Sequence, residues 1–388
     1  MRVLFLCPWL PWPLNSGGKI RTFHLIRCAA AHCELSLRAV LEPGQTQEMV
    51  EQVAPHVADL RVFERGKPGP LRRIARPKLE RWFYSPGLTA SAREELDQGR
   101  YDVVHVDELL LARTPPLGSR VPALQHHHKL DTELYARTTA HKGPQRHFDL
   151  WKLHRLERES ARRTTRHLAC SEGDAEILTQ RYPGLRVDVL PSGYDPAYFH
   201  PPQPALERDP DHIVYVGSMD YEPNVDAAVR FVREVLPALR AKRPELRFTL
   251  VGRSPAPEVR ALAGPGVEVT GEVDDVRPYL ASAGACVVPL RIGGGTRLKI
   301  AEALGMGTPV VSTTIGAEGL ELVHDEHLLL ADGYEEFARA TLQLLDDPRR
   351  AEALARAGRA HVEERFGWER LGAQLYQLWS RLREEARS

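Results

Sequence analysis

At 388 residues the chain is too long for one ordinary hydrophobic core and suits two domains. Its residues are 43% hydrophobic and 27% charged, which is ordinary for a globular protein and argues against a fibrous or disordered chain. The 52 Lys and Arg residues balance the 52 Asp and Glu residues, so no overall charge favours nucleic acid as a partner.

The first segment, residues 1–14, is apolar but does not read as an export signal. Its prolines would break a signal-peptide helix and no small-residue cleavage site follows, so we expect a buried first strand. No uninterrupted apolar run reaches the length of about eighteen residues expected of a membrane-spanning helix. The five cysteines are scattered and lack C-x-x-C spacing, as is typical of a reducing compartment. These features predict a cytoplasmic protein.

Short apolar or β-branched runs alternate with longer amphipathic stretches along the whole chain. This alternation indicates repeated strand–helix–strand units and a parallel sheet. In the first half we expect strands at residues 3–7, 35–40, 60–63, 103–106, 123–125, 167–170 and 187–190. In the second half we expect them at residues 213–216, 247–251, 267–270, 285–289, 310–313 and 328–330. Each half is therefore predicted to be an open α/β sheet.

A segment rich in proline and charge, residues 201–213, separates the two halves and has the composition of a linker. It predicts an N-terminal domain of residues 1–203 and a C-terminal domain of residues 204–367. The last segment, residues 368–388, has apolar residues at helical spacing and no strand after it. Such a helix must bury its apolar stripe on a domain already built, and a return to the first domain is one option.

Two glycine-rich loops follow predicted strands and lead into helices. The first contains Gly17 and Gly18, and the second runs from Arg291 to Lys299 with three glycines at 293–295. Consecutive glycines let backbone N–H groups converge on an oxyanion, and a helix start adds partial positive charge. If Thr296 caps the second helix, two cations stand in its first turn, where they oppose the helix dipole. We expect a diphosphate to compensate them, the alternative being a solvated glycine turn.

Several segments resemble the glycosyltransferases of family four. They are Gly17-Gly18 with Arg21, His128 to Asp131, Cys170 to Asp174, Pro191 to Asp195, Val216-Gly217, Val251-Gly252, Gly271 to Val273 and Lys299 to Ser312. The resemblance spans nearly the whole chain and is weakest over residues 45–100. It implies the α/β GT-B architecture, in which two Rossmann-like, doubly wound parallel-sheet domains face each other across a cleft. It further implies a retaining transfer from a nucleotide-diphosphate-sugar to a hydroxyl of a glycan, lipid-linked or small-molecule acceptor.

The same resemblance assigns roles to particular residues. It places His128 near the acceptor or the reacting hydroxyl as the catalytic candidate, with His127 as the alternative if the register slips. It matches Glu302 to a glutamate that holds the ribose hydroxyls, a chemically sensible role for a carboxylate. The expected donor-binding residues are Gly17, Gly18, Gly217, Val273, Gly294, Gly295, Thr296, Arg297, Lys299 and Glu302. The expected acceptor or sugar contacts are Lys19, Arg21, Asp107 and Glu318.

The chain also departs from the family pattern. Gly294 stands where the first signature glutamate would lie, and Ser218 and Pro223 stand where many members have an arginine and a lysine. Two cations missing there and two present at Arg297 and Lys299 suggest that the phosphate clamp has moved from one loop to its neighbour.

We expect no metal and no cofactor beyond the nucleotide-sugar co-substrate. No Asp-x-Asp with metal-site context is present, and Asp274-Asp275 is expected to be a turn. The run His126-His127-His128 cannot easily meet one ion, because adjacent side chains on a strand point to opposite faces; plain packing of this strand end is its structural alternative. Asp107 and Glu108 end a strand and could either contact acceptor hydroxyls or cap a helix.

Residues 61–84 form the most basic stretch of the chain. Eight cations stand against two acids there, interleaved with Leu71, Ile74, Leu79, Trp82 and Phe83. Residues 146–166 are also basic, with a helical look. Such a surface suits peripheral contact with an anionic membrane at its cytoplasmic face and a lipid-linked acceptor, whereas a solvated basic surface is the alternative.

Three other functions fit parts of the pattern. A nucleotide-sugar epimerase would share the architecture but act without an acceptor. A nicotinamide oxidoreductase is disfavoured because no G-x-G-x-x-G follows the first strand. A non-catalytic relative that binds nucleotide-sugars would explain the loss of the first signature glutamate.

Overall fold

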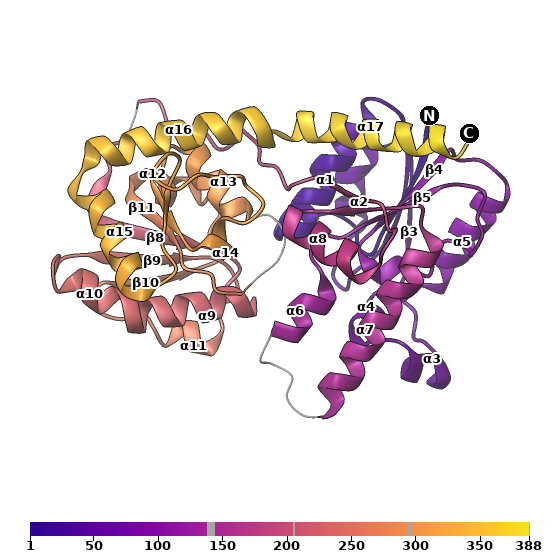
Figure 1. Ribbon diagram of the computed structural model, residues 1–388, viewed down its shortest axis with the longest axis horizontal. Coiled ribbons are helices and arrows are strands. Elements are labelled where there is room, and N and C mark those ends of the chain that lie inside the picture. The colour runs from indigo at the N-terminus through magenta and orange to yellow at the C-terminus, as the bar shows by residue number, and fades with distance from the viewer. Residues whose placement is uncertain (138–143, 205, 293–296, 388) are drawn as a thin grey trace. The chain divides into compact units, whose positions relative to one another are not determined.

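A computed structural model describes residues 1–137, 144–204, 206–292 and 297–387 (Figure 1). The chain forms two compact units, one of residues 1–191 with 368–388 and the other of residues 192–367. Residues 192–203, which the sequence assigned to the first domain, thus belong to the second unit. The reason is local: the Tyr194 N–H donates to the Phe366 carbonyl at 2.9 Å, and the Tyr194 ring lies in the core of the second unit.

The first unit is built on a seven-stranded sheet in the order β3-β2-β1-β4-β5-β6-β7, with every neighbouring pair parallel. Its strands are β1 (Arg2–Cys7), β2 (Glu34–Val40), β3 (Asp59–Phe63), β4 (Val103–Asp107), β5 (Ala123–His126), β6 (Arg166–Ala169) and β7 (Val187–Val189). Strands β1 and β4 are buried on both faces, which explains why they read as nearly continuous apolar runs.

Helices connect these strands. They are α1 (Gly17–Ala30), α2 (Gln47–Val53), α3 (Pro70–Ala75), α4 (Lys78–Trp82), α5 (Pro86–Asp97), α6 (Asp131–Arg137), α7 (Pro144–Arg163) and α8 (Glu172–Arg181), with the short 3-10 turns η1 (Ala54–His56) and η2 (Leu109–Leu111).

The C-terminal helix α17 (Trp368–Glu385) belongs to the first unit and lies along α1 (Figure 1). The two helices approach so closely that a Cβ on Gly372 would stand 2.4 Å from the Cβ of Cys28. The apolar stripe expected from the sequence is buried, with Trp368 and Trp379 among the largest fully buried side chains. The helix therefore completes the first unit.

The second unit is built on a six-stranded parallel sheet in the order β10-β9-β8-β11-β12-β13. Its strands are β8 (Asp209–Val216), β9 (Arg247–Val251), β10 (Val267–Gly271), β11 (Ala283–Val288), β12 (Val310–Ser312) and β13 (Leu329–Leu330). Its helices are α9 (Glu222–Arg230), the π-turn η3 (Phe231–Val235), α10 (Leu236–Arg240), α11 (Pro257–Arg260), α12 (Arg277–Ser282), α13 (Leu298–Gly305), α14 (Thr314–Ala317), α15 (Tyr334–Asp346) and α16 (Pro348–Phe366). Each of the thirteen strands coincides with a stretch predicted from the sequence.

In both sheets the strand order reverses beside the first strand. Strand β1 lies between β2 and β4, and β8 lies between β9 and β11. Ligands of open α/β sheets bind beyond the carboxyl ends of the strands at such a reversal. Each unit thus has one preferred place for a ligand, at the ends of β1 and β4 and at the ends of β8 and β11. Within the described ranges, none of the helices is both long and apolar enough to cross a bilayer.

Candidate functional site

A buried carboxylate occupies the strand reversal of the first unit. Asp107 ends β4 and has no exposed surface. One of its oxygens, Oδ2, accepts from Thr22 Oγ1 at 2.8 Å, and the other, Oδ1, lies 2.8 Å from His128 Nε2 and 3.1 Å from His126 Nδ1. Burial alone would raise the pKa of Asp107, but the two histidines outweigh it and hold the pKa well below its usual value. Asp107 is therefore a buried anion that orients His128.

Arg21 fixes the orientation of His126, which lies beside Asp107. Its guanidinium donates to His126 Nε2 from Nη2 at 2.9 Å and to the Leu190 carbonyl at 2.6 Å. An arginine N–H can only donate, so the ring hydrogen of His126 must sit on Nδ1, which faces Asp107. Arg21 itself is 1% exposed. In this conformation Arg21, which the sequence predicts as a sugar contact, is buried and holds His126.

One group of side chains has the spacing of a metal site. His105, Asp107 and His126 offer ligand atoms that lie within 4.8 Å of one another. However, Trp379 Nε1 donates to His105 Nδ1 at 3.1 Å, and the lone pair of His126 is already taken by Arg21. Burial also lowers the pKa of His105 to about 3, so this ring stays neutral. His105 Nε2 lies 3.2 Å from His126 Nδ1 and 4.0 Å from Asp107 Oδ1, so the three groups form one buried cluster.

His128 follows β5 and lies over Asp107, with a side chain that is 7% exposed. Its second ring nitrogen, Nδ1, is 3.4 Å from Glu108 Oε1. A Cβ on Gly18 would lie 3.6 Å from this Nδ1 and 3.2 Å from the ring of Trp9, so the missing side chain lets the start of α1 approach His128 closely. Gly17 is the first residue of that helix.

His127 points away from this site. Its Nε2 lies 2.9 Å from His167 Nδ1, and both rings are fully buried. The alternation expected for adjacent side chains on a strand is thus present, and His128 rather than His127 faces Asp107.

Glu108 and Lys19 each pair with an oppositely charged side chain of the first unit. Glu108 has a φ of 64°, a left-handed conformation that a non-glycine residue adopts at a cost of about 1–3 kcal/mol and that often marks functional sites. Its side chain caps no helix and instead lies 3.3 Å from Lys129 Nζ. Lys19 forms an ion pair of 2.6 Å with Glu42.

Glycines end three adjacent strands at the strand reversal of the second unit. Gly217, Gly252 and Gly271 follow or end β8, β9 and β10. A Cβ on Gly252 would stand 1.7 Å from the carbonyl oxygen of Gly217, so no other residue fits there. The missing side chains therefore let Lys299 and Asn224 pack directly against the backbone at the end of β8.

Lys299 is directed to the end of β8. Its Nζ lies 2.8 Å from Asn224 Oδ1 and 3.1 Å from Tyr215 Oη, and it stands 4.3 Å from the centre of the Tyr215 ring. A Cβ on Gly217 would meet this nitrogen at 2.7 Å. Burial lowers the pKa of Lys299 to about 7. The Lys299 amine thus lies beside Gly217, at the end of β8.

Tyr215 and Asn224 were missed by the sequence analysis. Tyr215 donates to Asn224 Oδ1 at 2.8 Å and lies at the centre of the second unit's core. Because their role depends on contact with a lysine far along the chain, their own sequence neighbourhood carries no signal for it.

The remaining predicted donor residues surround the start of α13. This helix begins at Leu298 with Arg297 as its N-cap, and Thr296, the cap expected from the sequence, lies outside the described residues. The Arg297 guanidinium is 8% exposed and lies 3.6 Å from Glu318 Oε2. Arg297, expected to bind phosphate, and Glu318, expected to contact the sugar, are therefore neighbours. Burial raises the pKa of Glu302 to about 7.

Of the other predicted donor residues, the structure describes Val273 but not the three in the second glycine-rich loop. Val273 follows β10 half-buried. Gly294, Gly295 and Thr296 lie outside the described residues.

Comparisons with known proteins agree with this geometry. The model described as Glycosyltransferase Family 4 matches residues 20–198, and the one described as Glycosyl transferases group 1 matches residues 210–347. A GDP-mannose-dependent monoacylated alpha-(1-6)-phosphatidylinositol monomannoside mannosyltransferase of Corynebacterium glutamicum is 30% identical over 48% of the chain and 54% of its own length. The phosphatidyl-myo-inositol mannosyltransferase of Mycolicibacterium smegmatis is 25% identical over 98% of the chain and 93% of its own.

A solved structure, the sucrose-phosphate synthase of Thermosynechococcus elongatus, superposes with a TM-score of 0.74 at 21% identity, covering 98% of this chain and 99% of that one. The matched region thus spans about half the length of the Corynebacterium relative and nearly all of the other two. The chain belongs to the group 1 glycosyltransferases and has the GT-B fold. This assignment does not favour an epimerase.

Proposed function

We propose that the protein transfers a sugar from a nucleoside-diphosphate sugar to a hydroxyl of a glycan, lipid-linked or small-molecule acceptor. The observation that carries this proposal is the position of Lys299 Nζ beside Gly217, at the strand reversal of the second unit. An ammonium group in this position can donate a charge-assisted hydrogen bond to a phosphate oxygen. The Corynebacterium relative is named as GDP-mannose-dependent, which supports a nucleotide donor.

The proposed transfer retains the anomeric configuration and needs no metal. The acceptor oxygen forms a bond to the anomeric carbon on the face from which the diphosphate leaves, and a diphosphate oxygen takes the hydroxyl proton. Lys299 and Arg297 stabilise the negative charge that grows on the leaving group. His128, held by Asp107, supplies its second ring nitrogen as a hydrogen-bond partner for a sugar or acceptor hydroxyl.

A peripheral contact with an anionic membrane is the finer part of the proposal. Leu71 and Ile74 on α3 are 83% and 64% exposed, and Phe148 and Trp151 on α7 are 48% and 55% exposed. Ile74 of α3 and Phe148 of α7 line one hollow with Arg73 and Arg81, in which the buried Lys152 lies 3.4 Å from Asp149. Parts of the two basic stretches thus lie together beside exposed apolar side chains, a combination that suits a lipid interface.

A thermal-shift screen of the purified protein tests the core of this proposal. Nucleoside diphosphates and their sugars are added with and without EDTA; a ligand at a hundred times its dissociation constant stabilises the folded state by about 2.7 kcal/mol. We expect one base to respond, no loss of the response with EDTA, and slow hydrolysis of the matching donor. Absence of any nucleotide response would contradict a donor site, and binding without hydrolysis or transfer would indicate a non-catalytic relative. The anomeric configuration of the product, read by NMR, decides retention.

A further inference from the structure

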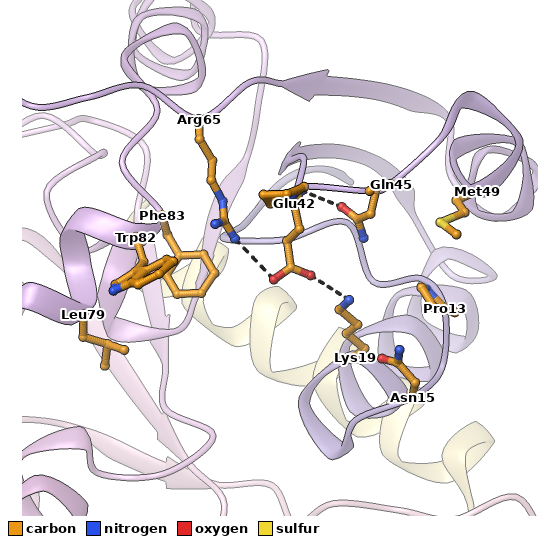
Figure 2. Close-up of a pocket in the computed structure, with 12 residues that line it drawn as sticks. Pro13, Asn15, Lys19, Glu42, Gln45, Met49, Arg65, Leu79, Trp82 and Phe83 are labelled. Carbon is orange, nitrogen blue, oxygen red and sulfur yellow. Dashed lines mark hydrogen bonds and ion pairs between the residues drawn. The ribbon is translucent and has the colours of Figure 1, made fainter. Parts of the chain in front are cut away.

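A pocket of about 650 Å³ opens on the first unit, separate from the layer that contains Asp107 (Figure 2). It forms where the turn after β2, the start of α1 and helix α4 come together. Its lining residues are Pro13, Asn15, Lys19, Glu42, Pro43, Gly44, Gln45, Met49, Arg65, Leu79, Trp82 and Phe83. This volume is within the range of small-molecule sites.

The polar side of the pocket is a carboxylate held between two cations. Glu42 Oε2 lies 2.6 Å from Lys19 Nζ, and Oε1 lies 3.3 Å from Arg65 Nη2 (Figure 2). This trio presents acceptors and donors side by side, with one positive charge in excess. A pair of neighbouring hydroxyls can donate to the carboxylate and accept from the cations at the same time.

The other side of the pocket is apolar. Trp82 is 58% exposed and Leu79 is 37% exposed, and both lie on α4, in which Glu80 is buried. Phe83 stands beside them and lies under the Arg65 guanidinium at 5.1 Å. An exposed indole next to hydrogen-bonding groups matches the two-sided chemistry of a pyranose, which has one face of C–H groups and a rim of hydroxyls.

The turn that carries Glu42 is built rigidly. Gly44 has a φ of 87°, which favours glycine, and the Glu42 N–H donates to Gln45 Oε1 at 2.7 Å. Gln45 Nε2 donates in turn to the Trp12 carbonyl at 2.6 Å. The side chain of Gln45 thereby fastens the turn to the loop between β1 and α1, so the carboxylate is held in place before any ligand arrives.

The pocket is linked to His128 through neighbouring aromatic rings. Phe83 packs edge-on against Trp9 with centroids 5.5 Å apart, and Trp9 in turn lies 6.3 Å from the His128 ring. Lys19 follows Gly18, the residue that approaches His128. A ligand in the pocket would therefore contact the start of α1, the same segment that approaches His128.

From these contacts we infer that the pocket binds a sugar ring of the acceptor and that the acceptor is a carbohydrate. The ring stacks on Trp82, and two of its hydroxyls bind the Glu42–Lys19–Arg65 trio. This inference rests on the proposed transferase activity, because it gives the acceptor a chemical class.

The test measures carbohydrate binding in the absence of donor. Labelled full-length protein is applied to immobilised neutral, uronate-bearing and phosphate-bearing oligosaccharides. We expect wild-type protein to bind a subset, Trp82→Ala and Glu42→Gln to lose at least tenfold in apparent affinity, and Trp151→Ala, which removes an exposed indole outside this pocket, to bind like the wild type. Wild-type protein that binds none of these sugars, or unchanged binding by Trp82→Ala, would overturn the inference.

A second measurement separates this failure from failure of the proposed function. Donor hydrolysis without acceptor should be unchanged in Trp82→Ala and Glu42→Gln, while the KM for the acceptor rises in transfer assays. If wild-type protein hydrolyses the donor but the two variants have the same KM for the acceptor as the wild type, only the assignment of the pocket is wrong. If wild-type protein neither binds nucleotide nor hydrolyses donor, the proposed function fails whatever the sugar array shows.

Discussion

Nε2 of His128 lies 2.8 Å from Oδ1 of Asp107, and the carboxylate behind this contact has no access to solvent. A buried anion in this position holds a ring hydrogen of His128 on Nε2, and Nδ1 on the other side of the ring lies 3.4 Å from Glu108 Oε1. Asp107 is thus a positioning residue for His128, which explains why an acidic side chain at the end of a strand neither meets solvent nor caps a helix.

We expect His128→Ala to lower turnover by roughly 10²-fold or more, in the range of single groups that assist proton transfer or charge stabilisation. Nucleotide affinity should stay within about twofold, because the predicted donor contacts other than Gly17 and Gly18 lie on the second unit. His127→Ala is the matched control, since that ring is bonded to His167 on the opposite side of the strand. Turnover assays and nucleotide titrations check this, and equal losses in both variants would contradict a specific role for His128.

Asp107→Asn tests the same relationship without changing the size of the side chain. An amide has only one acceptor oxygen, so its nitrogen either donates to the Thr22 hydroxyl, which then loses its own acceptor, or faces a ring hydrogen of His126 or His128. We expect a loss of turnover comparable to that of His128→Ala and little further loss in the double variant, because the two residues act as a unit. Additive losses in a double-mutant cycle would show that they act separately.

The packing of Gly252 against Gly217 predicts the most severe effect on stability. A methyl group at residue 252 would meet the Gly217 carbonyl at 1.7 Å, and backbone cannot move aside as a side chain can. We expect Gly252→Ala to lower the free energy of unfolding by roughly 2–4 kcal/mol or to prevent folding. Gly264→Ala, where a Cβ would meet nothing within 4 Å, should change it little. Chemical denaturation of both variants checks this, and similar midpoints would show that the loop adjusts freely.

The strands could be predicted from the sequence, whereas the contacts between distant residues could not. Parallel strands buried on both faces leave apolar runs, so β1 and β4 are visible in the sequence alone. The contact of Arg21 with His126 depends on strand order, and that of Lys299 with Asn224 depends on where α13 starts. Arg21 therefore looked like a ligand contact, because an arginine after a glycine loop carries no sign that it will be buried.

The hypothesis of a relocated phosphate clamp predicts the effect of removing its two cations. Arg297→Ala with Lys299→Ala should weaken nucleoside-diphosphate binding by roughly 10²–10⁴-fold, since hydrogen bonds to charged groups are worth roughly 1.5–3 kcal/mol each and two are removed. The free nucleoside, which has no phosphate, should bind equally to both proteins. Isothermal titration checks this, and unchanged diphosphate affinity would show that the clamp lies elsewhere.

The surface formed by α3 and α7 predicts salt-dependent binding to anionic vesicles. Replacing Leu71 and Ile74 by serine removes apolar area that a bilayer would bury, so we expect at least a tenfold weaker partition into phosphatidylglycerol-containing vesicles. Val323→Ser, which alters an exposed apolar residue of the second unit, is the control. Sedimentation with vesicles at low and high salt provides the measurement. Wild-type protein that ignores anionic lipid at both salt concentrations would leave α3 and α7 as a solvated basic surface.

Proton uptake should accompany nucleotide binding at the second unit. Burial lowers the pKa of Lys299 to about 7, so at pH 8 most of the unliganded protein carries a neutral amine there. A diphosphate beside it favours the charged form, and binding must then take up to one proton from solution. Affinity should accordingly fall as the pH rises from about 7 to 8.5.

Titration calorimetry at pH 8 in two buffers of different ionisation enthalpy measures this uptake directly. Glu302, whose pKa burial raises to about 7, could also take up a proton near a new anion, so Glu302→Gln serves as the comparison. We expect the uptake to persist in Glu302→Gln and to vanish in Lys299→Met. Loss of the uptake in Glu302→Gln alone would assign the proton to the carboxylate, and equal heats in both buffers for wild-type protein would show that Lys299 is already charged before the diphosphate binds.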